Sequence, residues 1–395
     1  MFNLPEIYVK MRLSEQFYYL KDIFDLNKDT IEISGSNTKI CNLNFSSPLG
    51  IYDPDENENA NFPGREDGTI SENRVFKYPV FLPESGRKYS SLILLLHGLN
   101  ERSWFKHLAW ARYLCESTGK PVLMFPFSFH MNRSLPGWTN KNEMLSGLEL
   151  RNAKYSDIRD SSIANYVLSQ RLTDIPQRFF LSGYQSALDL TSLIKDIRAG
   201  NHFLFEAGCR IDVFSYSIGV FLAECMMIAN PENIFDDSKF VFFAGGSLFQ
   251  EMNGVSKYIM DNKAFDRIFY YYMKEMDEDI RSNSSMRNVL KGTSMGKAFR
   301  SMISYDRLRN FREKALEKYK SRILTIPLSN DKVIPSAPTV NLLKKTACTE
   351  KNIKIMDFKF PCIHENPFPV NLKEFSADID EAFLKVFSLS GSFLR

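Results

Sequence analysis

The 395-residue sequence lacks several features that would assign it to an easily recognised class of protein. No apolar stretch approaches the roughly 20 residues that a membrane-spanning helix needs, so we expect no membrane span. Residues 1–20 carry several charges and no apolar core of a signal peptide, so we expect no secretory signal. The net charge of only +3 gives no reason to expect a nucleic-acid partner or an anionic membrane surface.

Residues that could hold a metal are also scarce. The six cysteines include no Cys-x-x-Cys pair, and several lie in apolar surroundings. Reduced, buried thiols fit this pattern, and together with the missing signal they predict a cytoplasmic protein. The five histidines do not cluster with cysteines or carboxylates at the spacing of a metal site. The sequence therefore predicts no metal and no organic cofactor.

Apolar residues, by contrast, are abundant. They make up 44% of the chain and include 33 phenylalanines, which is ample for a large core. A chain of this length forms one large domain with insertions or two domains. Buried strands alternate with amphipathic helices from about residue 75 onward, which predicts an α/β protein with a doubly wound, mostly parallel sheet.

The most informative stretch lies near the middle of the chain. A short strand, Ile211–Phe214, precedes a sharp turn and the almost wholly apolar helix predicted for Ile218–Ala229. Ser217 stands at the turn, with Ser215 and Gly219 two places on either side. Small residues at these places allow a tight turn, and the helix N-terminus offers unpaired N–H groups to a developing oxyanion. Ser217 is thus a candidate nucleophile, although a serine here could also simply cap a buried helix.

This pattern resembles the nucleophile elbow of the α/β-hydrolase superfamily, with Ser215 in place of the usual first glycine. A second resemblance lies upstream, where the apolar run 91–96 ends in His97-Gly98. It is similar to the oxyanion loop of that superfamily. The resemblance implies an oxyanion hole formed by the backbone N–H groups of Leu99 and Ile218; the alternative for this loop is a simple turn.

The superfamily resemblance also implies a triad in the chain order serine, acid, histidine. His364 is the only one of the five histidines that follows Ser217, and it lies between the last predicted strand and the final helix. Asp331 directly follows the strand predicted for Arg322–Leu328 and begins a stretch similar to the acid loop of the superfamily. The alternatives are a solvated loop histidine, another of the many intervening acids, and Ser247 as the nucleophile.

The predicted architecture has four parts. Residues 1–74 form an N-terminal extension, and residues 75–246 form the first part of the α/β-hydrolase core. Residues 247–320 contain charged amphipathic helices and no strand, which predicts a helical cap inserted into the core. Residues 321–395 complete the core, including a strand at Ile353–Phe360. As candidates for substrate contacts we take Arg133 and Trp138, in an irregular loop after the strand at 121–125, and Tyr216 in the elbow.

The resemblance implies an enzyme that cleaves an ester or related acyl bond of a small-molecule substrate through a Ser217–His364–Asp331 triad. Among such enzymes, a carboxylic ester hydrolase is the leading hypothesis. A peptidase or an acyltransferase with the same triad is an alternative, because the fold hosts many activities. A hypothesis of a different class is a non-catalytic binding protein on the same scaffold. The discriminating observation is whether the three side chains meet in an open cleft.

Overall fold

We describe the protein from a computed structural model, which places residues 12–48, 62–84 and 88–395. Eight strands form one sheet in the order β1-β2-β3-β5-β4-β6-β7-β8. The three strand pairs at the β1 end of the sheet are antiparallel and the other four are parallel. The strands are β1 (Thr30–Glu32), β2 (Thr38–Ser46), β3 (Val75–Pro83), β4 (Tyr89–Leu96), β5 (Val122–Met124), β6 (Phe205–Tyr216), β7 (Phe240–Phe243) and β8 (Ile323–Ile326).

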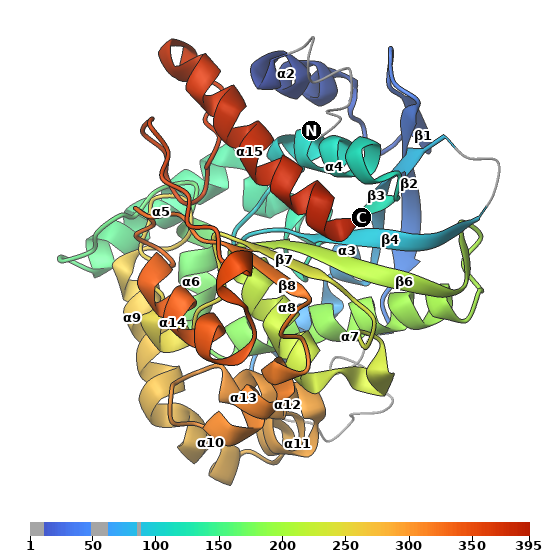
Figure 1. Cartoon of the computed structure of the whole chain (residues 1–395). Coiled ribbons are helices and arrows are strands. Elements are labelled where there is room, and N and C mark those ends of the chain that lie inside the picture. The colour runs from blue at the N-terminus through green and yellow to red at the C-terminus, as the bar shows by residue number, and fades with distance from the viewer. Residues whose placement is uncertain (1–11, 49–61, 85–87) are drawn as a thin grey trace.

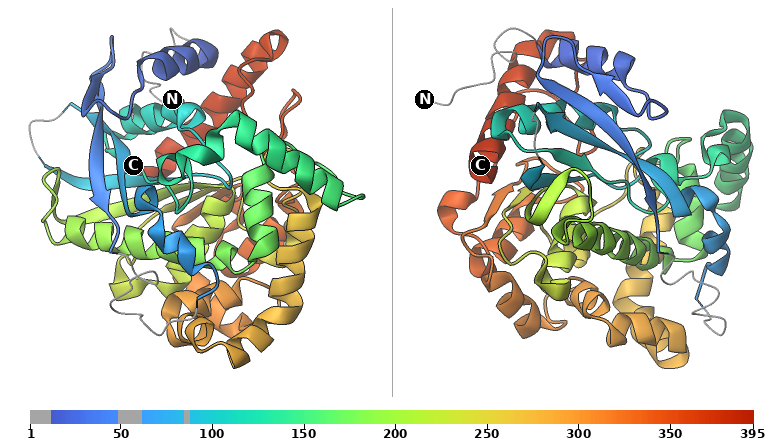
Figure 2. Two further views of the ribbon diagram at one scale, coloured as in Figure 1. Left: turned by 180° about the vertical axis from the view of Figure 1, so that it is seen from behind. Right: turned by 90° about the vertical axis from the view of Figure 1, so that its right-hand side faces the viewer.

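Helices cover both faces of this sheet, as Figures 1 and 2 show. One face carries α2 (Leu13–Ile23), α4 (Phe105–Thr118) and α15 (Ser376–Leu394). The other carries α7 (Arg178–Arg198), α8 (Ile218–Ala229) and α14 (Ser336–Thr346). This arrangement confirms the predicted fold class, a doubly wound, mostly parallel sheet of the α/β-hydrolase type.

The apolar run of β4 shows how the sequence fills both layers. Successive side chains of a strand point to opposite faces of a sheet. Leu92, Leu94 and Leu96 accordingly belong to the core under α7 and α8, while Ile93 and Leu95 belong to the core under α4 and α15. All five are almost fully buried. A continuous apolar run is therefore required here, because this central strand has no solvent-facing side.

Two helical insertions extend the core on the side of α7 and α8. The first follows β5 and contains α5 (Lys141–Lys154) and α6 (Tyr166–Asp174). The second follows β7 and contains α9 (Asn262–Tyr270), α10 (Met276–Ser282), α11 (Ser284–Gly292), α12 (Ser294–Ser301) and α13 (Arg309–Glu317). The second insertion packs α9 against α6 and α12 against α8, at the bottom of Figure 1. No helix in the described ranges is both long enough and apolar enough to cross a bilayer.

The structure corrects three details of the sequence-based prediction. β1 and β2 pair with β3, so the sheet begins within residues 1–74 and not at Val75. The strand predicted at Ile353–Phe360 is reduced to two isolated bridges with the β8 segment, because only Met356 and Phe360 of this stretch are buried. The loop after β5, predicted to be irregular, contains α5.

Candidate active site

Ser217 occupies the turn between β6 and α8. Its backbone has φ 58° and ψ −126°, in the left-handed half of conformational space that only glycine adopts at little cost. The turn is held by the Ser217 N–H, which donates to the carbonyl of Phe243 at the end of β7 over 3.1 Å. A strained serine between a strand and a helix projects its hydroxyl from the end of the sheet.

The residues around Ser217 explain why small side chains are needed at the turn. A Cβ atom on Gly219 would lie 2.7 Å from the carbonyl oxygen of His97, so only glycine fits there. Ser215 is fully buried, and its hydroxyl donates to the carbonyl of Val241 over 3.2 Å. The serine in place of the usual glycine therefore fits into the core with its polar group satisfied.

The structure brings Ser217, His364 and Asp331 into one hydrogen-bonded row. The Ser217 Oγ lies 2.5 Å from Nε2 of His364, and the His364 Nδ1 lies 2.7 Å from Oδ2 of Asp331. The other carboxylate oxygen of Asp331 accepts from the N–H groups of Val333 and Ile334, at 2.9 and 3.0 Å. Both oxygens of Asp331 are thus fixed, which orients the imidazole with Nδ1 as donor and Nε2 as acceptor.

The loop that carries His364 is held from behind by two long side chains. The Tyr216 hydroxyl donates to the carbonyl of His364, and the Lys106 ammonium donates to the carbonyl of Glu365 over 2.6 Å. Lys106 also pairs with Glu101 and lies 4.7 Å from the centre of the Tyr216 ring. Burial raises the pKa of Glu101, and the neighbouring Lys106 opposes that rise.

Tyr216 itself is almost fully buried and lines none of the pockets described below. The structure thus places it behind His364 and outside the walls of these pockets. We expected Tyr216 to contact the substrate; instead its hydroxyl contacts the carbonyl of His364 and positions that loop. Its place in the elbow was visible in the sequence, but its partner lies 148 residues away.

His97 fixes the loop that follows β4. Its Nε2 accepts from the N–H of Phe127 over 2.9 Å, so its Nδ1 carries the proton and donates to the carbonyl of Gly98 at 2.8 Å. Burial lowers the pKa of His97 well below its usual value, which keeps the ring neutral. A neutral His97 therefore ties the β4 loop to the β5 loop and leaves Leu99 next to the serine.

Leu99, Ser217 and Ile218 line the same pocket, at the carboxyl ends of β4 and β6. The chain passes from β4 to β5 on one side and lies next to β6 on the other, so this is a switch point of the sheet. Crevices at such points are the usual ligand sites of α/β sheets. We name this pocket the serine pocket.

Two further pockets adjoin the serine pocket. The aromatic pocket has mainly apolar walls that include Phe127, Phe180, Phe221, Leu222, Met295 and Phe299. The arginine pocket has a polar wall that includes Arg102, Arg171 and Arg178 together with Trp138. The sequence did not predict either one, because their walls come from helices far apart in the chain.

The two candidate contacts in the β5 loop differ in their surroundings. Trp138 lines the arginine pocket, where the Arg171 guanidinium lies 4.3 Å from the centre of its ring. Arg133 is fully buried and bonds to Asp189 at 2.7 Å and to Asn73 at 3.0 Å. The structure makes Arg133 a buried structural ion pair, out of reach of a ligand in these pockets. An arginine in a polar loop gave no sign of that partner in the sequence.

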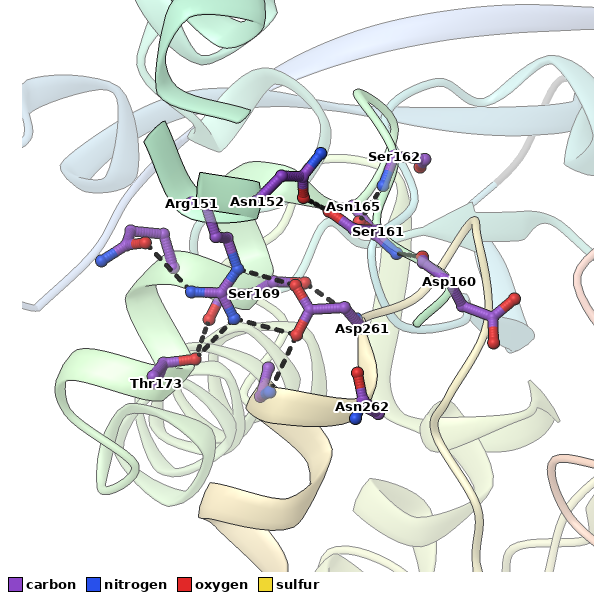
Figure 3. Close-up of polar contacts among 12 residues, drawn as sticks. Arg151, Asn152, Asp160, Ser161, Ser162, Asn165, Ser169, Thr173, Asp261 and Asn262 are labelled. Carbon is purple, nitrogen blue, oxygen red and sulfur yellow. Dashed lines mark hydrogen bonds and ion pairs between the residues drawn. The ribbon is translucent and has the colours of Figure 1, made fainter. Parts of the chain in front are cut away.

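A buried polar network fixes the two insertions to each other (Figure 3). Arg151 of α5 forms two hydrogen bonds to the Asp261 carboxylate, at 2.7 and 2.8 Å, and both side chains are almost fully buried. Asp261 also accepts from the N–H of Ala264 and so caps α9. The Asp261 N–H in turn donates to Ser169 of α6 over 3.0 Å. The α6 wall of the arginine pocket and the α9 wall of the serine pocket are thereby joined.

Ser247, the alternative nucleophile, follows β7. Its side chain is fully buried, and its hydroxyl has a long contact of 3.5 Å with the carbonyl of Leu248. In the part of the chain that the structure describes, no histidine is hydrogen-bonded to it. Within the same residues, no group of three or more His, Cys, Asp or Glu side chains is arranged to hold a metal ion.

Comparison with known protein families gives one match that covers nearly the whole chain. The model of DUF6051, described as a family of unknown function, matches residues 11–395. The chain belongs to the DUF6051 family. A search of curated proteins found no match to this DUF6051 chain.

Several solved structures share the outline of this DUF6051 protein. A thermostable esterase from Pseudomonas putida ECU1011 matches with 11% identity and a TM-score of 0.44, over 99% of this chain and 89% of the esterase. An esterase from Pyrobaculum calidifontis matches with 11% identity and a TM-score of 0.43, over 98% and 92%. An acylaminoacyl peptidase from Pyrococcus horikoshii matches with 12% identity and a TM-score of 0.41, over 80% and 39%. The fold assignment rests on the sheet itself and not on these distant likenesses.

Proposed function

We propose that this DUF6051 protein is a serine hydrolase that cleaves an ester or related acyl bond, most simply a carboxylic ester, through an acyl-enzyme. The observation that carries the proposal is the hydrogen-bonded row of Ser217, His364 and Asp331 beside an apolar pocket. The backbone of Ser217 is strained in this row, and such strain is typical of functional sites.

In the proposed mechanism His364 removes the proton of Ser217 while Oγ bonds to the carbonyl carbon of the substrate. His364 then gives that proton to the leaving group as the bond to the acyl carbon breaks. Asp331 holds the ring in the required tautomer and stabilises the imidazolium. Water, activated by His364 in the same way, attacks the acyl-enzyme and releases the acid and free Ser217.

The backbone N–H groups of Leu99 and Ile218 are proposed to stabilise the oxyanion. Their support is that both residues line the serine pocket with Ser217 and that Ile218 opens α8, where N–H groups have no partner within the helix. Each donor of this kind typically contributes about 3–4 kcal/mol to the stabilisation of the transition state.

We also propose that the insertion at residues 247–320 acts in part as a cap. Ile259, Met260, Phe265 and Ile268 from its first half line the serine pocket. Met295 and Phe299 of α12 line the aromatic pocket. The remaining helices of the insertion, α10, α11 and α13, contribute no residue to the three pockets and pack on the body of the protein.

Labelling with a fluorophosphonate, which reacts with activated serines, tests the proposal. We expect the wild-type protein to be labelled and Ser217→Ala to be unlabelled with a nearly unchanged thermal midpoint. Ser247→Ala serves as the matched control and should label as well as the wild type. Labelling that persists in Ser217→Ala would overturn the assignment. No labelling of the wild type, with no hydrolysis of a panel of esters and amides, would favour the non-catalytic binding protein.

A further inference from the structure

The three pockets around the site meet at one aromatic side chain. Leu99 and Phe179 line the serine pocket, the aromatic pocket and the arginine pocket alike. Leu99 belongs to the loop proposed to bind the oxyanion, so its position is tied to the chemistry. Phe179 comes from the first turn of α7 and takes no part in that chemistry. A substitution at Phe179 can therefore change the space around Ser217 without altering a residue that takes part in the reaction.

The contacts of Phe179 place its ring between the walls of two pockets. Its ring centre lies 5.5 Å from that of Phe249, which lines the serine pocket. It lies 6.4 Å from the ring centres of Phe221 and Phe299, which line the aromatic pocket. The ring thus lies between a wall residue of the serine pocket and two wall residues of the aromatic pocket.

The composition of the serine pocket defines the chemical class of its occupant. Of the three pockets, only this one is lined by Ser217 itself, so an acyl carbon bonded to Oγ begins there. None of its lining residues is charged, and its walls include Phe249, Met252, Ile259, Met260, Phe265 and Ile268. Burying an apolar chain against such a surface is favourable, whereas a charged group buried there would have no partner.

We propose that the serine pocket takes the apolar acyl chain of an ester substrate and that Phe179 limits the chain length by separating this pocket from the aromatic pocket. The inference rests on the proposed function, because it places the acyl group on Ser217. Removing the Phe179 ring opens the aromatic pocket, whose walls are mainly apolar, to the end of a longer chain. A larger ring at the same position shortens the chain that fits.

The test measures kcat/KM for p-nitrophenyl esters with straight acyl chains of two to twelve carbons. In Phe179→Ala we expect the ratio of kcat/KM on long chains to kcat/KM on short chains to rise at least about tenfold. A few additional methylene groups of the longer chain would then be bound in the pocket, and contacts of this size are worth about tenfold or more. Phe179→Trp should lower the same ratio. Phe179→Leu, a milder truncation, should give an intermediate profile and guards against loss of folding in the alanine variant.

Two further variants identify the route of the chain. Phe269→Ala is the matched control, because Phe269 packs on Phe249 and Phe265 but lines none of the three pockets. Its profile should follow the wild type. Adding Leu222→Phe, which narrows only the aromatic pocket, should cancel the gain of Phe179→Ala. A gain that survives Leu222→Phe would mean that the chain leaves by another path, and the inference would be wrong.

The outcome separates this inference from the proposed function. If all Phe179 variants remain labelled by the fluorophosphonate at Ser217 but share one chain-length profile with the wild type, the role of Phe179 is refuted and the hydrolase proposal stands. If Ser217→Ala retains ester hydrolysis, the hydrolase proposal fails, and the inference fails with it.

Discussion

Glu224 gives a stability prediction that depends only on the fold. This residue lies in the middle of α8, the helix that follows Ser217, and its side chain is fully buried. Neither carboxylate oxygen has a hydrogen-bond partner, and burial raises the pKa of Glu224 well above its usual value, with only Arg312 opposing. The Arg312 guanidinium instead donates to backbone carbonyls, among them that of Tyr305 at 2.8 Å. We therefore expect Glu224 to be protonated in the folded protein at neutral pH.

The cost of that protonation follows from the two pKa values of the group. Its folded pKa is raised above the unfolded one, so the penalty is absent below about pH 4.5 and grows as the pH rises toward the folded value. Each pH unit in that window costs about 1.4 kcal/mol. Glu224→Gln keeps the shape and needs no proton, so its stability relative to the wild type should increase as the pH rises through this window.

The assay is urea unfolding of wild type and Glu224→Gln at several pH values between 4.5 and 8. The difference in unfolding free energy should be near zero at the acid end and should grow as the pH rises, by no more than about 1.4 kcal/mol per pH unit. Glu232→Gln is the control, because this residue lies just past the same helix with a largely exposed side chain, and its effect should stay within about 0.5 kcal/mol. A difference that does not change with pH, or a less stable Glu224→Gln, would show that Glu224 is ionised in the fold.

Two other contacts give predictions, one for urea unfolding and one for ester kinetics. Arg151→Met should lower the free energy of unfolding by about 3–5 kcal/mol, because Asp261 then stays buried without its cation. Adding Asp261→Asn should recover part of the loss; no recovery in urea unfolding would contradict this account. Tyr216→Phe should reduce kcat by about ten- to hundredfold with little change in KM, because the ring remains but the hydroxyl no longer holds the loop of His364. Steady-state ester kinetics would refute a positioning role if KM alone changed.

The fold class was predictable because its signals are local. A buried parallel strand needs a continuous apolar run, and β4 and β7 each show one. The candidate site was also predictable, since side chains at the carboxyl ends of parallel strands converge whatever chain segments connect those strands. His364 needed no geometry at all, because no other histidine follows Ser217. The catalytic roles of these residues stay predictions until they are tested.

The partners of buried polar groups were not predictable. Arg133 occurs in a polar loop and looks solvated in the sequence, yet its guanidinium meets Asp189, 56 residues away on α7. Burying a charge is costly unless it is paired, so such a residue is placed by its partner and not by its own neighbours in the sequence. The prediction of a strand at Ile353–Phe360 was wrong for a related reason, since a strand also needs a neighbour, and this stretch forms only one bridge to β8 and one to Leu328 just past it.

The same reasoning explains why the walls of the site carry more information about the substrate than the triad does. The Ser217–His364–Asp331 row would serve any acyl bond, and its geometry is fixed by backbone contacts such as those of Phe243 and Val333. Part of the pocket walls comes from the two insertions, and the buried network around Asp261 holds these insertions in one arrangement (Figure 3). Substrate range can therefore change through wall residues such as Phe179 while the row stays intact. Exchanging pocket walls should change which chains are cleaved, whereas exchanging row residues should change only how fast.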